Sequence, residues 1–345
     1  MTEVPIAVPA SELRPLVSII ITTYTSKRLK DVLELLDSLK SQTYHRLEIV
    51  FVGENDPQLC ESVIQYAKES RMKGVRVLFN HGPRGLSHAR NLGAVQAKGE
   101  LLAFLDDDAL AFPDWAAALV DGFAERPEAI GVTGPAFPQW EDKSMCWFPE
   151  EFYWMISCPT PGWTGLGEAT WVRNAWGMNM AFRREAFMSC QFSEDFVGGN
   201  QGAADGTKLG LLGDDTDFSL RVSQTTGGKI LYSPTIRVRH KVYRHRLSPR
   251  FLRHRAFWEG YTKATLARSY KWKGIASHSL ATERALLRQI FFHFFPQLAL
   301  DSVNNPVLAW RRFILGMSTL CHISLGYWAG RFPRMGRPIV SWYTG

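Results

Sequence analysis

Apolar runs alternate with helical patterns through the first third of the chain, and this alternation constrains the fold more than any other feature. Residues 16–24 form a continuous β-branched run, typical of a strand buried on both faces, and residues 28–42 follow with apolar side chains at helical spacing. Further strands are predicted at 46–52, 75–79 and 101–105, and helices at 57–70, at 87–98 and from Pro113. Such βαβ units predict an α/β fold with a mostly parallel sheet and helices on both faces.

Four short segments fall where the predicted strands end: Thr22–Tyr24, Glu54, Gly82–Arg84 and Asp106–Asp108. Ligands of parallel α/β sheets bind outside the carboxyl ends of the strands. The convergence of these residues therefore predicts a binding site at that edge.

Three consecutive aspartates, Asp106, Asp107 and Asp108, follow the apolar run at 101–105. Like charges repel at this spacing, so they form either an exposed turn or a cation site. An Asp-x-Asp at a strand end suits Mn²⁺ or Mg²⁺ bridging a diphosphate, because such cations take carboxylate and phosphate oxygens. His240 is a candidate third ligand if the fold brings it to the aspartates.

A second acidic cluster contains Asp214, Asp215 and Asp217 and precedes a helical pattern. One interpretation is an N-cap with first-turn acids that the helix dipole stabilises. The other is a general base that removes a proton from an attacking hydroxyl. Both interpretations stay open at this point.

The pattern loosens after about residue 130. Residues 134–176 contain six tryptophans, which either fill a core or stack on sugar rings, and residues 195–213 form a glycine-rich polar loop. The net charge of +7 favours anionic partners. The acid-free basic segment 236–255 is either a phosphate or membrane contact or a solvated face.

The C-terminal region turns apolar from about residue 284. Residues 313–330 carry no charge over 18 residues, the lower limit of a membrane span. Interspersed glycine and serine favour helices that lie in the membrane interface, with a helical hairpin packed on the globular domain as the alternative. Five scattered cysteines indicate reduced thiols in a cytosolic compartment, and residues 1–15 lack the layout of a signal peptide.

Five segments resemble, in their order, family 2 inverting glycosyltransferases of the GT-A fold: "VSIIITTY", "GPRGLSHARNLG", "AFLDDD", "WGMNMAFRREAF" and "GDDTDFSLR". The resemblance covers about residues 16–270. It implies a tail at 1–15, a GT-A domain at 16–270 with a nucleotide-sugar half (16–130) and an acceptor half (131–270), and a helical membrane-associating region at 271–345.

The resemblance also implies roles for particular residues. Nucleoside and donor contacts would come from Thr22, Tyr24, Glu54, Arg90, Asp106 and Asp107. Metal ligands would be Asp108, Asp106 and His240. Asp215 would be the catalytic base, with Asp214 beside it. A wall between donor sugar and acceptor would come from Trp176, Gly177, Met178 and Asn179.

One loop departs from the family pattern. The usual Asp-Asp or Asp-Asn after the second strand is Gly53-Glu54-Asn55-Asp56 here. Either Glu54 replaces the base-contacting aspartate, or Asp56 reaches the base through a different turn. The resemblance still implies a UDP-sugar donor and Mn²⁺ or Mg²⁺ as the metal. It also implies a glycan or polyprenyl-linked acceptor and a location at the cytoplasmic face of an anionic membrane.

Two other functional classes are weaker fits. A nucleotidyltransferase usually has a glycine-rich basic loop directly after the first strand, and "TTYTSKRLK" contains no glycine. A non-catalytic sugar- or nucleic-acid-binding module does not need two acidic clusters, and no nucleic-acid recognition motif accompanies the basic segment. We therefore expect an enzyme with no nucleic-acid partner.

Overall fold

The computed structural model describes residues 14–54, 56–161, 165–194, 213–271 and 286–344. Its main sheet has the strand order β3-β2-β1-β4-β9-β6-β10-β8. The strands are β1 (Val17–Thr23), β2 (Leu47–Gly53), β3 (Val75–Phe79), β4 (Leu101–Asp106), β6 (Ala129–Thr133), β8 (Thr170–Val172), β9 (Asn179–Arg183) and β10 (Lys229–Tyr232). The first four run parallel, as predicted. The second half is mixed, because β9 inserts antiparallel between β4 and β6, and β8 pairs antiparallel with β10.

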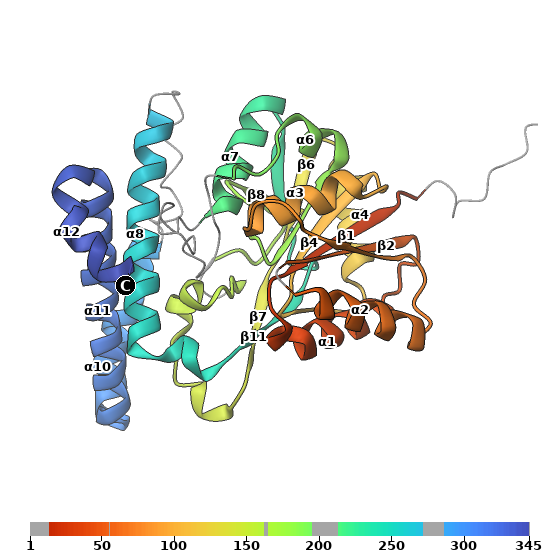
Figure 1. The fold of residues 1–345 in the computed structure, drawn as a ribbon. Helices are drawn as coiled ribbons and strands as arrows, with labels where there is room; N and C mark the ends of the chain where they lie inside the picture. The colour runs from red at the N-terminus through yellow and green to blue at the C-terminus, as the bar shows by residue number, and fades with distance from the viewer. Residues whose placement is uncertain (1–13, 55, 162–164, 195–212, 272–285, 345) are drawn as a thin grey trace, which may run out of the picture.

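Alternate residues of the strands belong to two cores on opposite faces of the sheet. Helices cover both faces (Figure 1). Ile19 and Ile21 pack with α1 (Leu29–Lys40), α2 (Pro57–Glu69) and α4 (Trp115–Glu125). Ile20 and Phe104 pack on the other face with α3 (Leu86–Gln96), α6 (Arg184–Ser189) and α7 (Asp214–Thr226). Burial on both faces explains why these strands read as continuous apolar runs in the sequence.

A small second sheet brings the middle of the chain to the end of β4. Its strands are β5 (Ala109–Ala111), β7 (Ala136–Trp140) and β11 (Val238–Val242), with β11 between the other two. In the antiparallel β5–β11 pair, His240 lies opposite Ala109, and the Lys241 N–H donates to the Asp108 carbonyl oxygen at 2.9 Å. The backbone register itself therefore places His240 beside the three aspartates.

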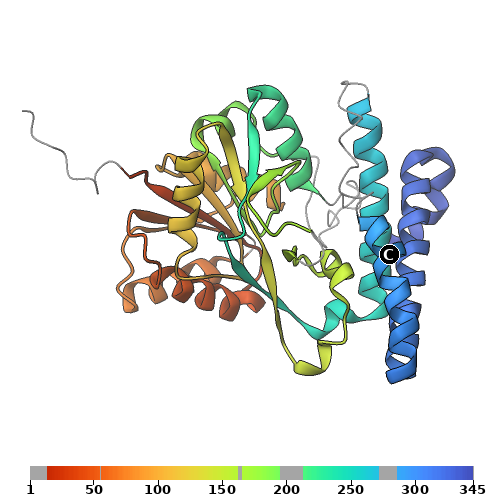
Figure 2. The ribbon, with the colours of Figure 1, turned by 180° about the vertical axis from the view of Figure 1, so that it is seen from behind.

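Long C-terminal helices stand along one side of the sheet domain (Figures 1 and 2). They are α8 (Pro249–Lys271), α10 (Phe295–Asn304), α11 (Pro306–Arg331) and α12 (Pro333–Thr344), with a π-helical turn η5 at Ile290–Phe294. Short 3-10 turns occupy η1 (Ser26–Arg28), η2 (Lys143–Met145), η3 (Glu150–Ile156) and η4 (Arg244–Leu247).

Helix α11 contains the uncharged run 313–330 and packs directly on α8. The approach needs glycine, because a Cβ on Gly326 would meet the Phe257 carbonyl oxygen at 1.9 Å, and one on Gly260 would meet that of Ile323 at 2.1 Å. One face of α11 therefore packs on the rest of the fold, and contact of these helices with a membrane interface stays a prediction. Within the described residues, every helix is too short or too polar to cross a bilayer.

Candidate active site

The three aspartates at the end of β4 point to different partners. Asp107 is buried and accepts from the Thr23 hydroxyl at 3.0 Å and from Arg28 Nη1 at 2.6 Å. The same Arg28 nitrogen lies 2.8 Å from Asp108 Oδ2. Burial and the neighbouring Asp108 raise the pKa of Asp107 to about 7. Asp106 is partly exposed and faces the site from the last position of β4.

Asp108 collects positive charge from distant parts of the chain. Arg246 Nη2 lies 2.6 Å from its Oδ2, and His240 Nε2 lies 3.0 Å from its Oδ1. Burial alone would raise the pKa of Asp108, but His240, Arg246 and Arg28 hold it well below its ordinary value.

Asp106, Asp108 and His240 can share one metal ion, because one ligand atom from each lies within 4.8 Å of the other two. The fold thus brings His240 to the aspartates. This was the condition under which His240 could be a third metal ligand. Carboxylates suit Mn²⁺ and Mg²⁺ alike, whereas an imidazole nitrogen suits transition metals better than Mg²⁺. The donor set therefore fits a divalent cation such as Mn²⁺ or Mg²⁺.

Arg90 joins the two acidic clusters. From α3 its Nη1 donates to Asp214 at 2.6 Å, and its Nη2 donates to Asp106 at 2.8 Å and to the Gly177 carbonyl at 3.1 Å. The side chain is 3% exposed. Burial raises the pKa of Asp214 to about 6, although Arg90 lowers it. Sequence reasoning selected Arg90 but not these partners.

Asp214 and Asp215 open helix α7 from within its first turn, after Gly213 in the left-handed region at φ 93°. Gly213 is the N-cap residue and has no side chain, so neither aspartate serves as a side-chain cap. Asp215 Oδ2 accepts from the Gly177 N–H at 2.9 Å, and its Oδ1 from the Thr216 N–H at 2.6 Å. These backbone donors fix the orientation of the Asp215 carboxylate.

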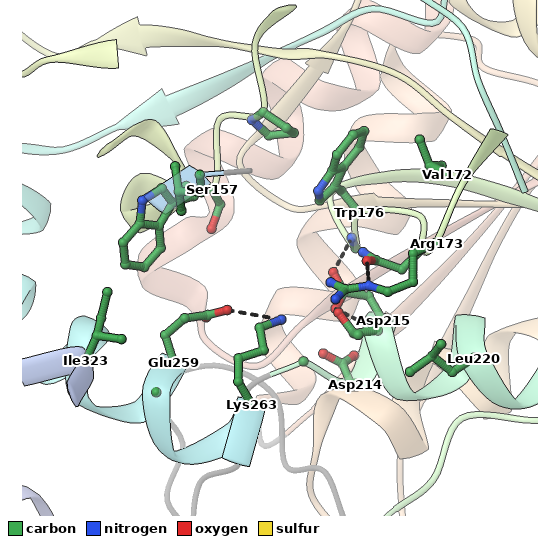
Figure 3. Close-up of a pocket in the computed structure, with 18 of the residues that line it drawn as sticks. Ser157, Val172, Arg173, Trp176, Asp214, Asp215, Leu220, Glu259, Lys263 and Ile323 are labelled. Carbon is green, nitrogen blue, oxygen red and sulfur yellow. Dashed lines mark hydrogen bonds and ion pairs between the residues drawn. The ribbon is translucent and has the colours of Figure 1, made fainter. Parts of the chain in front are cut away.

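A cavity of about 1610 Å³ lies between this edge and helices α8 and α11 (Figure 3). Asp106, Arg90, Asp214 and Asp215 line it together. The expected acceptor wall is brought there in part, by Trp176, Gly177 and Met178.

Asn179 of the expected wall is placed elsewhere. Its side chain is fully buried, accepts from the Trp115 indole at 2.9 Å and donates to the Ile236 carbonyl at 2.7 Å. This amide ties α4 and the 236 region to β9, so it has no surface to offer an acceptor. We therefore correct its assignment from the acceptor wall to the structural core.

The expected nucleoside contacts lie at the ends of β1 and β2. Tyr24 is 40% exposed, and Thr22 pairs in register with Asp106 across β1 and β4. Glu54 is 4% exposed and accepts from the Asn80 amide at 2.8 Å and the Gly85 N–H at 3.2 Å. A contact of Glu54 with a base stays a prediction.

Asp56, the alternative to Glu54, serves as the N-cap of α2 and accepts from the Leu59 N–H at 3.4 Å. Sequence reasoning missed Arg28 and singled out Arg246 only as one of many cations in 236–255. Of the six tryptophans, Trp163 lies outside the described residues, as does nearly all of loop 195–213. Trp154 and Trp171 line the cavity with Trp176.

Sequence comparisons agree with this geometry. The sequence model described as glycosyl transferase family 2 matches residues 18–190. A glucosyl-dolichyl phosphate glucuronosyltransferase of Haloferax volcanii is 32% identical over 299 residues, which are 85% of this chain and 88% of that protein. The succinoglycan biosynthesis protein ExoM of Rhizobium meliloti is 27% identical over 248 residues, 71% of this chain and 73% of that protein.

Solved structures share the fold. The mannosyltransferase PcManGT of Pyrobaculum calidifontis, solved with GDP-Man and Mn²⁺, superposes with a TM-score of 0.58 at 19% identity and covers 92% of this chain and 88% of its own. GalNAc-T7, solved with UDP, GalNAc and Mn²⁺, gives a TM-score of 0.51 at 20% identity over 86% of this chain and 59% of its own. These likenesses identify the fold as GT-A, with a C-terminal helical region added.

Proposed function

Because the chain belongs to glycosyl transferase family 2 and is a glycosyltransferase of the GT-A fold, we propose that it moves a sugar from a UDP-sugar to a hydroxyl of a lipid-linked glycan, with inversion at the anomeric carbon. The observation that carries this proposal is the Arg90 bridge. Arg90 bonds both Asp106 and Asp214 at one cavity, which supports a metal site and a general base that act on the same substrate.

Asp106, Asp108 and His240 would hold the cation, with Mn²⁺ favoured over Mg²⁺ by the imidazole. When bound, it supplies charge neutralisation for the departing diphosphate, a term that is usually large in such reactions. Arg28 and Arg246 both lie within 2.8 Å of Asp108, so they add positive charge next to the proposed site of the cation and the diphosphate. Thr22, Tyr24 and Glu54 contact the nucleoside in this proposal.

Asp215 acts as the general base. Its carboxylate is held by two backbone N–H groups and lines the cavity, so an acceptor hydroxyl can reach it. Asp214 stays paired with Arg90 and keeps that cation in place. One in-line displacement accounts for inversion: the acceptor oxygen loses its proton to Asp215 and bonds to the anomeric carbon, while the bond from that carbon to the diphosphate oxygen breaks and UDP leaves.

The proposed acceptor and location are supported by the C-terminal helices and by the Haloferax relative, whose name gives a dolichyl phosphate substrate. Helices α10 and α11 expose large apolar side chains, with Leu300 at 63%, Val303 at 83%, Val307 at 78% and Trp310 at 63%. Such a surface suits the interface of an anionic membrane, which we place at the cytoplasmic face.

The experiment is a transfer assay with a panel of UDP-sugars, Mn²⁺ and a short-chain prenyl-phosphate glycan, with the product's anomeric configuration read by NMR. The proposal predicts a product of inverted anomeric configuration. It also predicts that no product forms when EDTA chelates the Mn²⁺. Retained configuration, or transfer that proceeds equally in EDTA, would contradict it.

A further inference from the structure

The cavity has a wall that the proposed transfer chemistry does not use. Helix α8 contributes Arg255, Glu259 and Lys263, whose spacing of four residues places them on one helix face. Helix α11 contributes Ile323 and Tyr327. In Figure 3, Glu259 and Lys263 are seen between Asp215 and Ile323. From the sheet edge to α11, the lining of the cavity thus changes from the carboxylates of α7 to the charged side chains of α8 and then to apolar side chains.

Two residues that line this cavity each carry a buried nitrogen donor that lacks an acceptor. They are the Arg255 Nε and the Trp154 indole Nε1, neither of which has a hydrogen-bond partner among the described residues. Burying a donor without an acceptor is unfavourable, and native structures usually satisfy such groups with protein, water or ligand oxygens. Unsatisfied donors in the lining favour a ligand that brings oxygen acceptors to this part of the cavity.

The charge on the same wall favours an anion. Lys263 Nζ lies 3.2 Å from Glu259 Oε1, and Arg255 Nη2 lies 3.9 Å from Glu259 Oε2, so one carboxylate is shared by two cations. Arg331, at the end of α11, lines the cavity as well. Guanidinium and ammonium groups around a partly enclosed space are suited to phosphate oxygens.

We infer that this wall is the acceptor subsite, in which Arg255 and Lys263 bind the phosphate of a prenyl-linked acceptor. The prenyl chain lies along the apolar face of α11, formed by Leu320, Ile323 and Tyr327. The inference rests on the proposed function, because the sugar carried by that phosphate then reaches Asp215. It also separates three arginines in the first turns of α8: Arg250 and Arg253 are exposed, whereas Arg255 lines the cavity.

The test is calorimetric binding of farnesyl monophosphate, used below its micelle concentration, to the full chain. We expect Arg255→Gln and Lys263→Gln each to weaken binding about tenfold, as expected for the loss of a charged hydrogen bond. The matched control is Arg253→Gln, on the exposed side of the same helix, which should bind as wild type does. Farnesol and inorganic phosphate should each bind far more weakly than farnesyl monophosphate.

Three results would overturn the inference. One is unchanged binding of farnesyl monophosphate by both cavity variants. Another is equal binding of farnesol, which would make the site purely apolar, and the third is equal binding of inorganic phosphate, which would make it a free-anion site. UDP binding with Mn²⁺, measured on the same samples, checks their folding and tests the proposed donor site separately.

Discussion

The two walls of the cavity are built in opposite ways. On the sheet edge, carboxylates are paired within the protein: Arg90 bridges Asp106 and Asp214, while Arg28 and Arg246 meet at Asp108. On the wall that faces it, Arg255 leaves a buried donor unsatisfied, and apolar side chains line the space. A preorganised edge suits stabilisation of developing charge, and an unsatisfied wall suits capture of a ligand.

Replacing the proposed base at the start of α7 should give the largest effect. Asp215→Asn keeps the shape of the side chain but cannot accept the acceptor's proton, so kcat should fall by about 10³-fold. Single-turnover transfer measures this loss, and UDP binding should be retained. Asp121→Asn, on the exposed surface of α4, is the control. Substantial remaining activity would exclude Asp215 as the base.

Removing the bridge should destabilise the sheet edge itself. Arg90→Met leaves Asp106 and Asp214 without their shared cation, and breaking a buried ion pair in this way costs about 3–5 kcal/mol. Urea unfolding should show this decrease, whereas the exposed Arg126→Met should stay within about 0.5 kcal/mol of wild type. A stability equal to wild type would show that Arg90 does not hold the two clusters together.

The pH dependence of stability tests the burial of Asp214 beside Arg90. The folded-state pKa of Asp214, about 6, lies above its ordinary value. The folded chain therefore holds this proton after the unfolded chain has lost it, and the free energy of unfolding falls as pH rises from about 4 to about 6, by on the order of 1–3 kcal/mol. Asp214→Asn should flatten that slope. Its stability at any single pH is not diagnostic, because Arg90 also loses a partner. If the slope is unchanged in Asp214→Asn, the fall in stability does not come from the raised pKa of Asp214.

Substitutions on the exposed apolar face of α10 and α11 should give the smallest effect. The double variant Val303→Ser, Val307→Ser removes exposed apolar surface that we propose contacts the membrane interface, so partitioning onto anionic vesicles should fall about tenfold. Val95→Ser, at a site 46% exposed on α3, is the matched control. Co-sedimentation measures both. Equal partitioning of all three proteins would remove α10 and α11 from the membrane contact.

The parallel half of the fold was predictable because its signals are local. The strands at 46–52 and 101–105 match β2 and β4 within one residue, since doubly buried strands must be apolar throughout. The later strands escaped prediction: β8 has three residues and β11 alternates with basic side chains. Their existence depends on tertiary pairing rather than on local pattern.

The site was predictable to the extent that its residues follow strands. Strand-end position was enough to find the aspartates, and the family resemblance added Asp215. The partners of Asp108 were not accessible in this way, because Arg28 and Arg246 are 80 and 138 residues away along the chain. Asn179 shows the reverse error: its motif suggested contact with substrate, but its amide satisfies buried backbone and indole groups.

The measurement that tests the central claim most directly is calorimetric binding of UDP and GDP, each with Mn²⁺ and with EDTA, to wild type and Asp108→Asn. The account predicts that UDP binds with Mn²⁺, that EDTA abolishes binding, and that Asp108→Asn loses it. Preference for GDP would keep the metal site and overturn the uridine contacts assigned to Glu54 and Tyr24. UDP binding that is equal in EDTA and in Asp108→Asn would contradict the assignment of the sheet edge as the diphosphate and metal site.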